Sequence, residues 1–136
     1  MVTWRHDDGG RAVAGYRGEA GDCVARAIAI ATDTPYREAY ALVADAVHAA
    51  TGKRSARNGV PTKVIRALLA DLGFKWTPTM EVGSGTRVHL RADELPAGTL
   101  IVRLSGHVTV VSDGTVLDTH DPSRGGTRAV YGYWRQ

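Results

Sequence analysis

The sequence predicts an α+β domain, in which helices from the first half of the chain pack on one face of an antiparallel sheet from the second half. Apolar residues recur at helical spacing up to Leu72, and from Phe74 onward they alternate with a period of two. Turn residues separate the short runs of the second half. Helices first and strands second is the order of α+β folds, and 136 residues suit one domain over residues 1–136.

Three helices are expected in the first half, over residues 22–32, 35–51 and 61–72. Thr34 as N-cap and Pro35 at the first helical position favour the start of the second helix. Gly52 and Gly73 are typical stop residues for the second and third. The side chains expected to face inward are Tyr36, Ala39, Tyr40, Val43 and Val47 on the second helix and Val64, Ile65, Leu68 and Leu69 on the third.

The strands are expected mainly in the second half, whereas residues 1–10 are expected to be flexible. A short strand over Ala12–Tyr16 would precede the glycine-containing loop before the first helix. Asp113-Gly114 is a strong signal for a hairpin turn. The strand candidates of the second half are Phe74–Thr79, Arg87–Arg91, Thr99–Leu104, Val108–Val111, Thr115–Thr119 and Ala129–Trp134.

Composition excludes several functional classes. The net charge of +3 comes mostly from 14 arginines spread along the chain, so nucleic acid is not an expected partner. The N-terminus lacks a signal-peptide pattern and no apolar stretch is long enough to span a membrane, so we expect a cytoplasmic protein. One cysteine excludes an intramolecular disulfide and a CxxC motif, and five scattered histidines without HExxH give no reason to expect a metal or other cofactor.

The single cysteine, Cys23, follows Gly21 and Asp22 at the start of the first expected helix. Unpaired N–H groups and the positive end of the helix dipole favour thiolate over thiol at such a position. Cysteine is also a common core residue, so an inert buried side chain is the alternative interpretation. Its place in the first turn favours a catalytic nucleophile.

A candidate base, His107, opens a strand about eighty residues later, and two carboxylates compete to orient it. If Asp113-Gly114 forms a two-residue type I′ turn, Asp118 lies on the same face of the hairpin as His107. If the loop has three residues with a glycine bulge, Asp121 shares that face instead. We favour Asp118 slightly.

The other four histidines are weaker candidates. His6 lies in the expected flexible terminus, and His48 lies on the polar flank of the second helix. His89 has no acid placed to orient it, and His120 is interpreted as a strand-end residue.

Taken together, these residues resemble the papain-like cysteine peptidases, and within them the C39-type peptidases and their relatives in phage genomes. The resemblance rests on Gly21-Asp22-Cys23 before an Ala/Ile-rich helix, on His107 followed by Val-Thr-Val-Val, and on Asp121-Pro122. It covers roughly residues 16 to 134 in the order of elements, and the stretch from Asp118 to Trp134 is also similar to small phage and prophage proteins. The resemblance implies a papain-like fold, and it implies that Asp121 orients the histidine.

The function expected from these features is a cysteine-dependent hydrolase or acyl transferase acting on a peptide, isopeptide or related amide. Position 17 is Arg where the resemblance implies a Gln of the oxyanion hole, so Arg17 or another group would be the second donor. The alternative is an idle papain-like scaffold that binds a protein, for example a phage factor. The missing Gln, the small size and an aromatic patch of Tyr131, Tyr133 and Trp134 favour that alternative.

Overall fold

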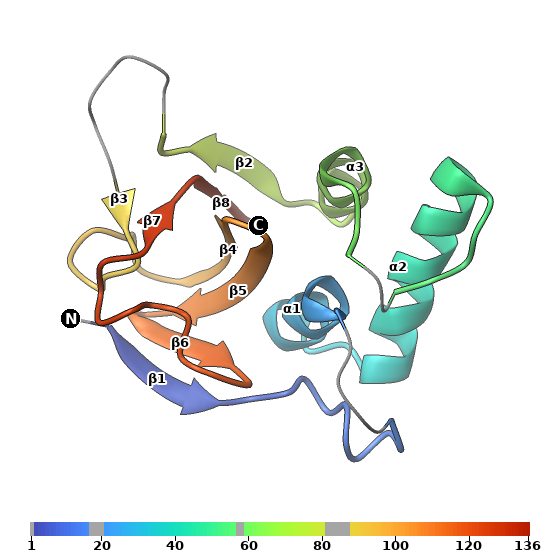
Figure 1. Ribbon diagram of the computed structural model, residues 1–136, viewed down its shortest axis with the longest axis horizontal. Helices are drawn as coiled ribbons and strands as arrows, with labels where there is room; N and C mark the ends of the chain where they lie inside the picture. Colours follow the sequence, from blue (N-terminus) through green and yellow to red (C-terminus); the bar gives the residue numbers. More distant parts are fainter. Residues whose placement is uncertain (1, 17–20, 57–58, 81–87) are drawn as a thin grey trace. The chain divides into compact units, whose positions relative to one another are not determined.

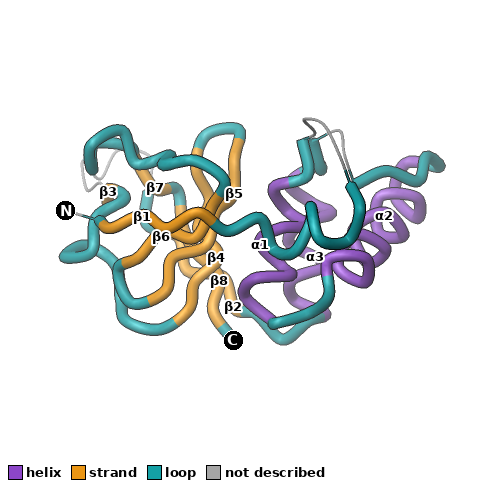
Figure 2. The backbone as a smooth tube through the Cα atoms, turned by 90° about the horizontal axis from the view of Figure 1, so that it is seen from below, coloured by secondary structure: helices purple, strands orange, loops and turns teal. Residues whose placement is uncertain are grey.

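The computed structural model describes residues 2–16, 21–56, 59–80 and 88–136, which form two compact units (Figure 1). The helical unit comprises Asp8–Phe74, and the sheet unit comprises Met1–Asp7 with Lys75–Gln136. Among the described residues, all helices lie in the first unit and all strands in the second, coloured purple and orange in Figure 2. The α+β class is therefore confirmed, whereas one domain over residues 1–136 and helices packed on the sheet stay predictions.

The helical unit contains the three expected helices, α1 (Cys23–Thr32), α2 (Tyr36–Thr51) and α3 (Thr62–Asp71). Each has an apolar stripe at helical spacing, which is why these segments are helical and which face they bury. The predicted inward residues are buried, except that Tyr40 is half-buried. The buried ones are Tyr36, Ala39, Val43 and Val47 on α2 and Val64, Ile65, Leu68 and Leu69 on α3.

The start of α2 differs from the prediction by one residue. Pro35, not Thr34, is the N-cap, and no side chain caps the helix. The hydroxyl of Thr34 is instead hydrogen-bonded to that of Thr32, 2.6 Å away. The predicted stops are confirmed, because Gly52 and Gly73 both adopt positive φ angles of 81° and 87° that other residues rarely take.

The expected strand over Ala12–Tyr16 does not form, because this segment is a series of turns. The carboxylate of Asp8 accepts hydrogen bonds from the backbone N–H groups of Gly10 and Ala12, at 2.9 and 3.0 Å. Such a side-chain bond to the following backbone competes with extended structure. The turns that Asp8 stabilises therefore replace the strand that was predicted here.

The sheet unit contains a six-stranded sheet in the order β1-β6-β5-β4-β8-β2 and a two-stranded sheet of β3 and β7. Most predicted strands of the second half are confirmed within one or two residues. The bounds are β1 (Thr3–His6), β2 (Lys75–Pro78), β3 (Val88–His89), β4 (Thr99–Leu104), β5 (His107–Ser112), β6 (Thr115–Asp118), β7 (Ala129–Val130) and β8 (Gly132–Arg135). Arg87, the first residue of one predicted strand, lies outside the described residues.

The six-stranded sheet is mixed, which corrects the prediction of an antiparallel sheet. The strand β1 pairs with β6 in parallel, from Thr3 opposite Thr115 to His6 opposite Asp118. It lies within the ten residues that were expected to be flexible. All four of its residues are exposed, so no buried face and no alternation of apolar residues marked it in the sequence.

The predicted strand over Ala129–Trp134 is divided into β7 and β8, which belong to different sheets. The division falls at Tyr131, whose N–H donates to the carbonyl of Arg103 and whose carbonyl accepts from Thr79. The sheet core consists of buried aliphatic side chains from both sheets and the loop between them. Its members are Leu90, Leu100, Val102, Leu104, Val111, Val116 and Val130.

Candidate functional site

The hairpin of β5 and β6 brings His107 and Asp118 together. Ser112 pairs with Thr115, so the turn has two residues, and Asp113 and Gly114 both have positive φ angles of 47° and 81°. These are the features of a type I′ turn. The turn places the two candidate side chains on one face, with Nε2 of His107 2.7 Å from Oδ2 of Asp118.

The carboxylate of Asp118 is buried and accepts hydrogen bonds from His107, Thr109 and Thr119. Its side chain is 3% exposed, and Oδ2 accepts a hydrogen bond from the hydroxyl of Thr109 at 2.7 Å as well as from His107. Oδ1 accepts from the backbone N–H of Thr119 at 2.7 Å. Burial raises the pKa of Asp118, but the hydrogen bonds from His107 and Thr109 lower it by more, so the pKa lies below its ordinary value. Asp118 is therefore a fixed anion beside the imidazole.

The strand β1 supports this end of the hairpin. The indole N–H of Trp4 donates to the backbone carbonyl of Asp118 at 3.2 Å, and the N–H of Asp7 donates to the same carbonyl at 2.9 Å. Both donors come from the N-terminal segment, more than 100 residues away in the sequence. Sequence reasoning missed this support, because it expected the segment to be flexible.

Asp121, the second predicted carboxylate, does not orient His107 in the structure. It is exposed, and its Oδ1 accepts a hydrogen bond from the N–H of Ser123 at 2.9 Å. A carboxylate that bonds the backbone two residues onward stabilises a turn, which suits Asp before Pro122. The role that the resemblance implies for Asp121 is thus not supported by the geometry of the hairpin.

His120 lies beside the His107–Asp118 pair, although sequence reasoning gave it no role. Its ring centroid is 5.3 Å from that of His107, and its Nδ1 is 3.9 Å from Oδ1 of Asp118. Its side chain is 57% exposed. The signal in the sequence is its position two residues after Asp118, which keeps the two side chains close along the chain.

His89 has an acidic partner, which corrects the expectation that none is placed to orient it. Its Nδ1 lies 3.1 Å from Oε1 of Glu94, which also accepts the backbone N–H of His89. Both side chains are partly exposed, and Arg91 forms an ion pair with the same carboxylate. The pair is a surface interaction that closes a short loop.

Cys23 is the first residue of α1 in the helical unit, as predicted, and its side chain is partly exposed. The N-cap residue Asp22 does not cap the helix through its side chain. Cys23 lies at the start of the helix, where the helix dipole and the backbone N–H groups favour negative charge. Arg17, the candidate oxyanion donor, lies outside the described residues.

The side chain of Asp22 is 1% exposed and forms the centre of a polar cluster. Arg26 contacts Oδ1 at 2.5 Å, whereas Arg11 contacts Oδ2 at 3.0 Å. The hydroxyl of Tyr36 donates to Oδ2 at 2.6 Å. Burial, together with the hydrogen bond to Asp22, raises the pKa of Tyr36 far above its ordinary value. This cluster joins the segment before α1 to the start of α2, which fixes the backbone that presents Cys23.

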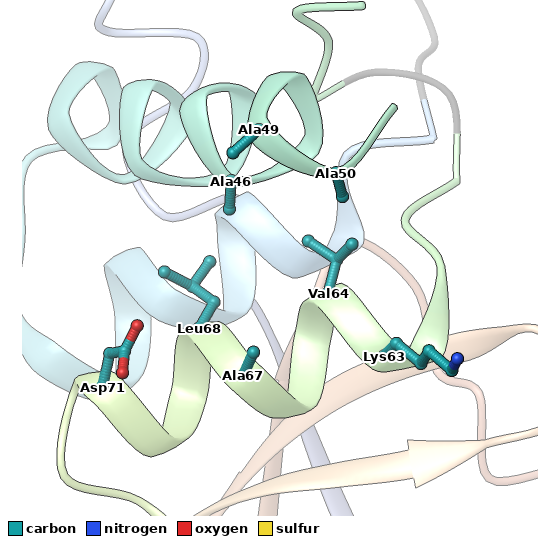
Figure 3. A pocket seen from close by; sticks show the side chains of 8 residues that line it. All are labelled: Ala46, Ala49, Ala50, Lys63, Val64, Ala67, Leu68 and Asp71. Atoms are coloured by element: carbon teal, nitrogen blue, oxygen red, sulfur yellow. The ribbon is translucent and has the colours of Figure 1, made fainter. Parts of the chain in front are cut away.

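A groove with a volume of about 380 Å³ lies between α2 and α3 (Figure 3). Its lining is mostly alanine and aliphatic side chains, with Lys63 and Asp71 at opposite ends of α3. Sequence analysis did not predict it. The residues that line it are Ala46, Ala49, Ala50, Lys63, Val64, Ala67, Leu68 and Asp71.

The aromatic patch expected near the C-terminus is not a surface patch. Trp134 is 2% exposed and packs against Trp76, with ring centroids 4.4 Å apart. Tyr133 is half-buried, and only Tyr131 is exposed. The contact between Trp76 and Trp134 therefore stabilises the pairing of β2 with β8.

Comparisons with family models, with curated proteins and with solved structures find no match for this chain. In the part of the chain that the structure describes, no helix combines the length and the apolar composition that crossing a membrane requires.

Proposed function

We propose that this chain is a cysteine-dependent hydrolase or acyl transferase that acts on a peptide, an isopeptide or a related amide. One observation carries the proposal: the imidazole of His107 is hydrogen-bonded to a buried carboxylate, Asp118, that is itself held by Thr109. A base oriented by a third group is the recurring feature of nucleophilic catalysis on diverse folds. The proposed nucleophile is the thiol of Cys23 at the start of α1.

The hydrogen bond to Asp118 assigns a role to each nitrogen of His107. Because Nε2 faces Asp118, it carries the proton, and Nδ1 is the nitrogen that would accept a proton from the thiol. The low pKa of Asp118 keeps this carboxylate charged, so that it stabilises the imidazolium that forms.

In the proposed reaction, the sulfur of Cys23 forms a bond to the substrate carbonyl carbon while His107 takes the thiol proton. The C–N bond of the amide then breaks, and His107 returns the proton to the leaving amine. The resulting thioester is resolved by water in a hydrolase or by an amine in a transferase. No electron transfer occurs, so the reaction needs no redox partner.

A protein-binding factor on an idle scaffold is the second candidate, and the groove between α2 and α3 favours it. An open, mostly apolar groove of this size is a feature of binding surfaces. Because none of its lining residues is Cys23, His107 or Asp118, this candidate does not require the thiol to be activated.

The rate of thiol alkylation at about pH 6 distinguishes the two candidates. An ordinary thiol with a pKa of about 8.5 is only roughly 0.3% thiolate at pH 6, so it reacts slowly. An activated Cys23 should react much faster with iodoacetamide, and His107→Ala should remove that advantage. His89→Ala is the matched control, because His89 also pairs with a carboxylate in the sheet unit. A rate that does not respond to His107→Ala contradicts the enzyme proposal and favours the binding factor.

A further inference from the structure

The side chains of His107, Asp118 and His120 form a cluster with three potential metal ligands. Each offers one ligand atom, and these atoms all lie within 4.8 Å of one another. Two come from adjacent strands, and the third lies two residues after the end of β6. The cluster combines residues that are 11 and 13 positions apart, so no short motif such as HExxH could reveal it.

The three donors are of the types that bind zinc in proteins. Two imidazoles and one carboxylate are used by catalytic zinc centres, which keep a further position for water. The same set suits other divalent transition metals such as Co²⁺ and Ni²⁺, whereas Mg²⁺ and Ca²⁺ prefer oxygen ligands alone. We propose that His107, Asp118 and His120 bind one divalent transition metal ion, with Zn²⁺ as the reference ion.

The geometry is close to that of a bound ion. Bonds of about 2.0–2.1 Å in a tetrahedral site place neighbouring ligand atoms roughly 3.3 Å apart. The separation of His107 Nε2 from Asp118 Oδ2 is 2.7 Å, and that of His120 Nδ1 from Asp118 Oδ1 is 3.9 Å. These two distances end on different carboxylate oxygens and bracket the required value. All three ligand atoms lie within 4.8 Å of one another, so changes of at most about 1.5 Å in their separations bring them to it.

The three ligands differ in exposure in a way that favours reversible binding. Thr109 and the backbone N–H of Thr119 hold the Asp118 carboxylate, and this outer support orients a metal ligand as it orients a catalytic one. The side chain of His107 is 14% exposed, whereas that of His120 is 57% exposed. The ion can therefore enter from solvent on the side of His120, whose ring is free of the core.

Metal binding and the proposed catalysis exclude each other. The ion takes the place of the proton between His107 and Asp118, so the imidazole can no longer act as an oriented base. Inhibition by the metal rests on the proposed function, whereas the metal site itself does not. The site would thus be an inhibitory one for a thiol enzyme.

Binding of ZnCl₂ to the full chain, measured by isothermal titration calorimetry, tests the site. The wild-type chain should bind one Zn²⁺, Asp118→Asn should lose this binding, and His120→Asn should weaken it at least about tenfold. His89→Asn is the matched control and should leave the affinity unchanged, because His89 pairs with Glu94 elsewhere in the sheet unit. The visible spectrum of bound Co²⁺ should report a low-symmetry site with nitrogen and oxygen ligands.

Three outcomes would overturn the proposal. They are no stoichiometric binding by the wild type, an unchanged affinity in His120→Asn, and loss of binding in Cys23→Ser, which would assign the ion to the thiol. Circular dichroism of Asp118→Asn checks that this variant is folded, and His120→Asn provides a test at an exposed position. Zn²⁺ binding through these ligands in a chain whose alkylation rate does not depend on His107 would support the metal site and contradict the proposed function.

Discussion

Two buried aspartates, one in each unit, lie beside the candidate catalytic residues and have different kinds of partner. Asp22 is 1% exposed and contacts two arginines and a tyrosine, whereas Asp118 is 3% exposed and contacts a histidine and a threonine. The first cluster pairs its carboxylate with arginines, whereas the second pairs it with a histidine, the side-chain type that serves as a proton acceptor near neutral pH. Burial of a carboxylate alone therefore does not indicate that it orients a histidine; the chemistry of its partners does.

The two clusters also differ in what their loss should change. Asp22 joins Arg11, Arg26 and Tyr36 from three parts of the helical unit, so its removal takes the carboxylate away from two largely buried arginines. The side chain of Asp118 accepts hydrogen bonds from residues of its own hairpin and from Thr119, so an isosteric amide can keep most of the packing. Substitution of Asp22 is expected to lower stability, and substitution of Asp118 is expected to lower activity.

The largest expected effect is that of Asp118→Asn on turnover. Under the proposed function, the amide neither favours the required tautomer of His107 nor stabilises the imidazolium, and a loss of about 10⁴ in kcat is the known scale for such a change in a serine protease. The fold should persist, as shown by an unchanged circular dichroism spectrum. Steady-state kinetics on an amide substrate measure the loss.

Asp121→Asn is the matched control, because Asp121 is exposed and its carboxylate accepts a hydrogen bond from the backbone N–H of Ser123. Its cost in turnover should be small. The opposite ranking would assign the orienting role to Asp121, as the resemblance to C39-type peptidases implies.

Asp22→Ala should have the largest effect on stability. Removing one partner of a buried ion-pair cluster costs about 3–5 kcal/mol, because the remaining charges stay desolvated. Urea unfolding followed by circular dichroism measures it. Asp45→Ala is the control, since the ion pair of Asp45 with Arg54 is exposed and contributes little. Equal effects of the two changes would show that the Asp22 cluster is solvated in solution.

Tyr36→Phe tests the same cluster with a smaller change. The lost hydrogen bond to a charged group is worth about 1.5–3 kcal/mol near neutral pH. Because the folded pKa of Tyr36 lies above its unfolded value of about 10, its contribution is complete below pH 10 and is lost as the pH rises further. The wild type should therefore lose stability above pH 10 more steeply than Tyr36→Phe.

Urea midpoints between pH 8 and pH 11 measure this difference. Tyr40→Phe is the control, because it removes a neighbouring tyrosine hydroxyl and leaves the bond from Tyr36 to Asp22 in place. The two ring centroids lie 6.1 Å apart. Parallel curves for the wild type and Tyr36→Phe would mean that Tyr36 ionises normally in the folded chain.

The sequence predicted those features that depend on local rules. Asp113-Gly114 specifies a type I′ turn, and this turn fixes the register that brings Asp118 to His107. Helical spacing likewise identified the buried faces of α2 and α3. In each of these cases, the residues that determine the structure are neighbours in the chain.

Features that depend on distant partners were missed. The strand β1 has no buried face, and its pairing with β6 and the bond from Trp4 to Asp118 join residues more than 100 positions apart. The Asp22 cluster includes Arg11, which precedes α1, and Tyr36, which follows it. No spacing pattern in the sequence predicts this cluster. His120 was underestimated because a histidine acquires a role from its spatial neighbours, which a single sequence does not show.

The smallest expected effect on stability is that of Cys23→Ser. The side chain lies in the first turn of α1 and is partly exposed, so its replacement should cost less than about 1 kcal/mol. Under the proposed function the same change should abolish hydrolysis and thiol labelling together. Asp22→Ala, one residue earlier, should instead lower the stability of the fold strongly. Thermal unfolding of both variants makes the comparison, and a strongly destabilised Cys23→Ser would identify Cys23 as a core residue and contradict its role as a nucleophile.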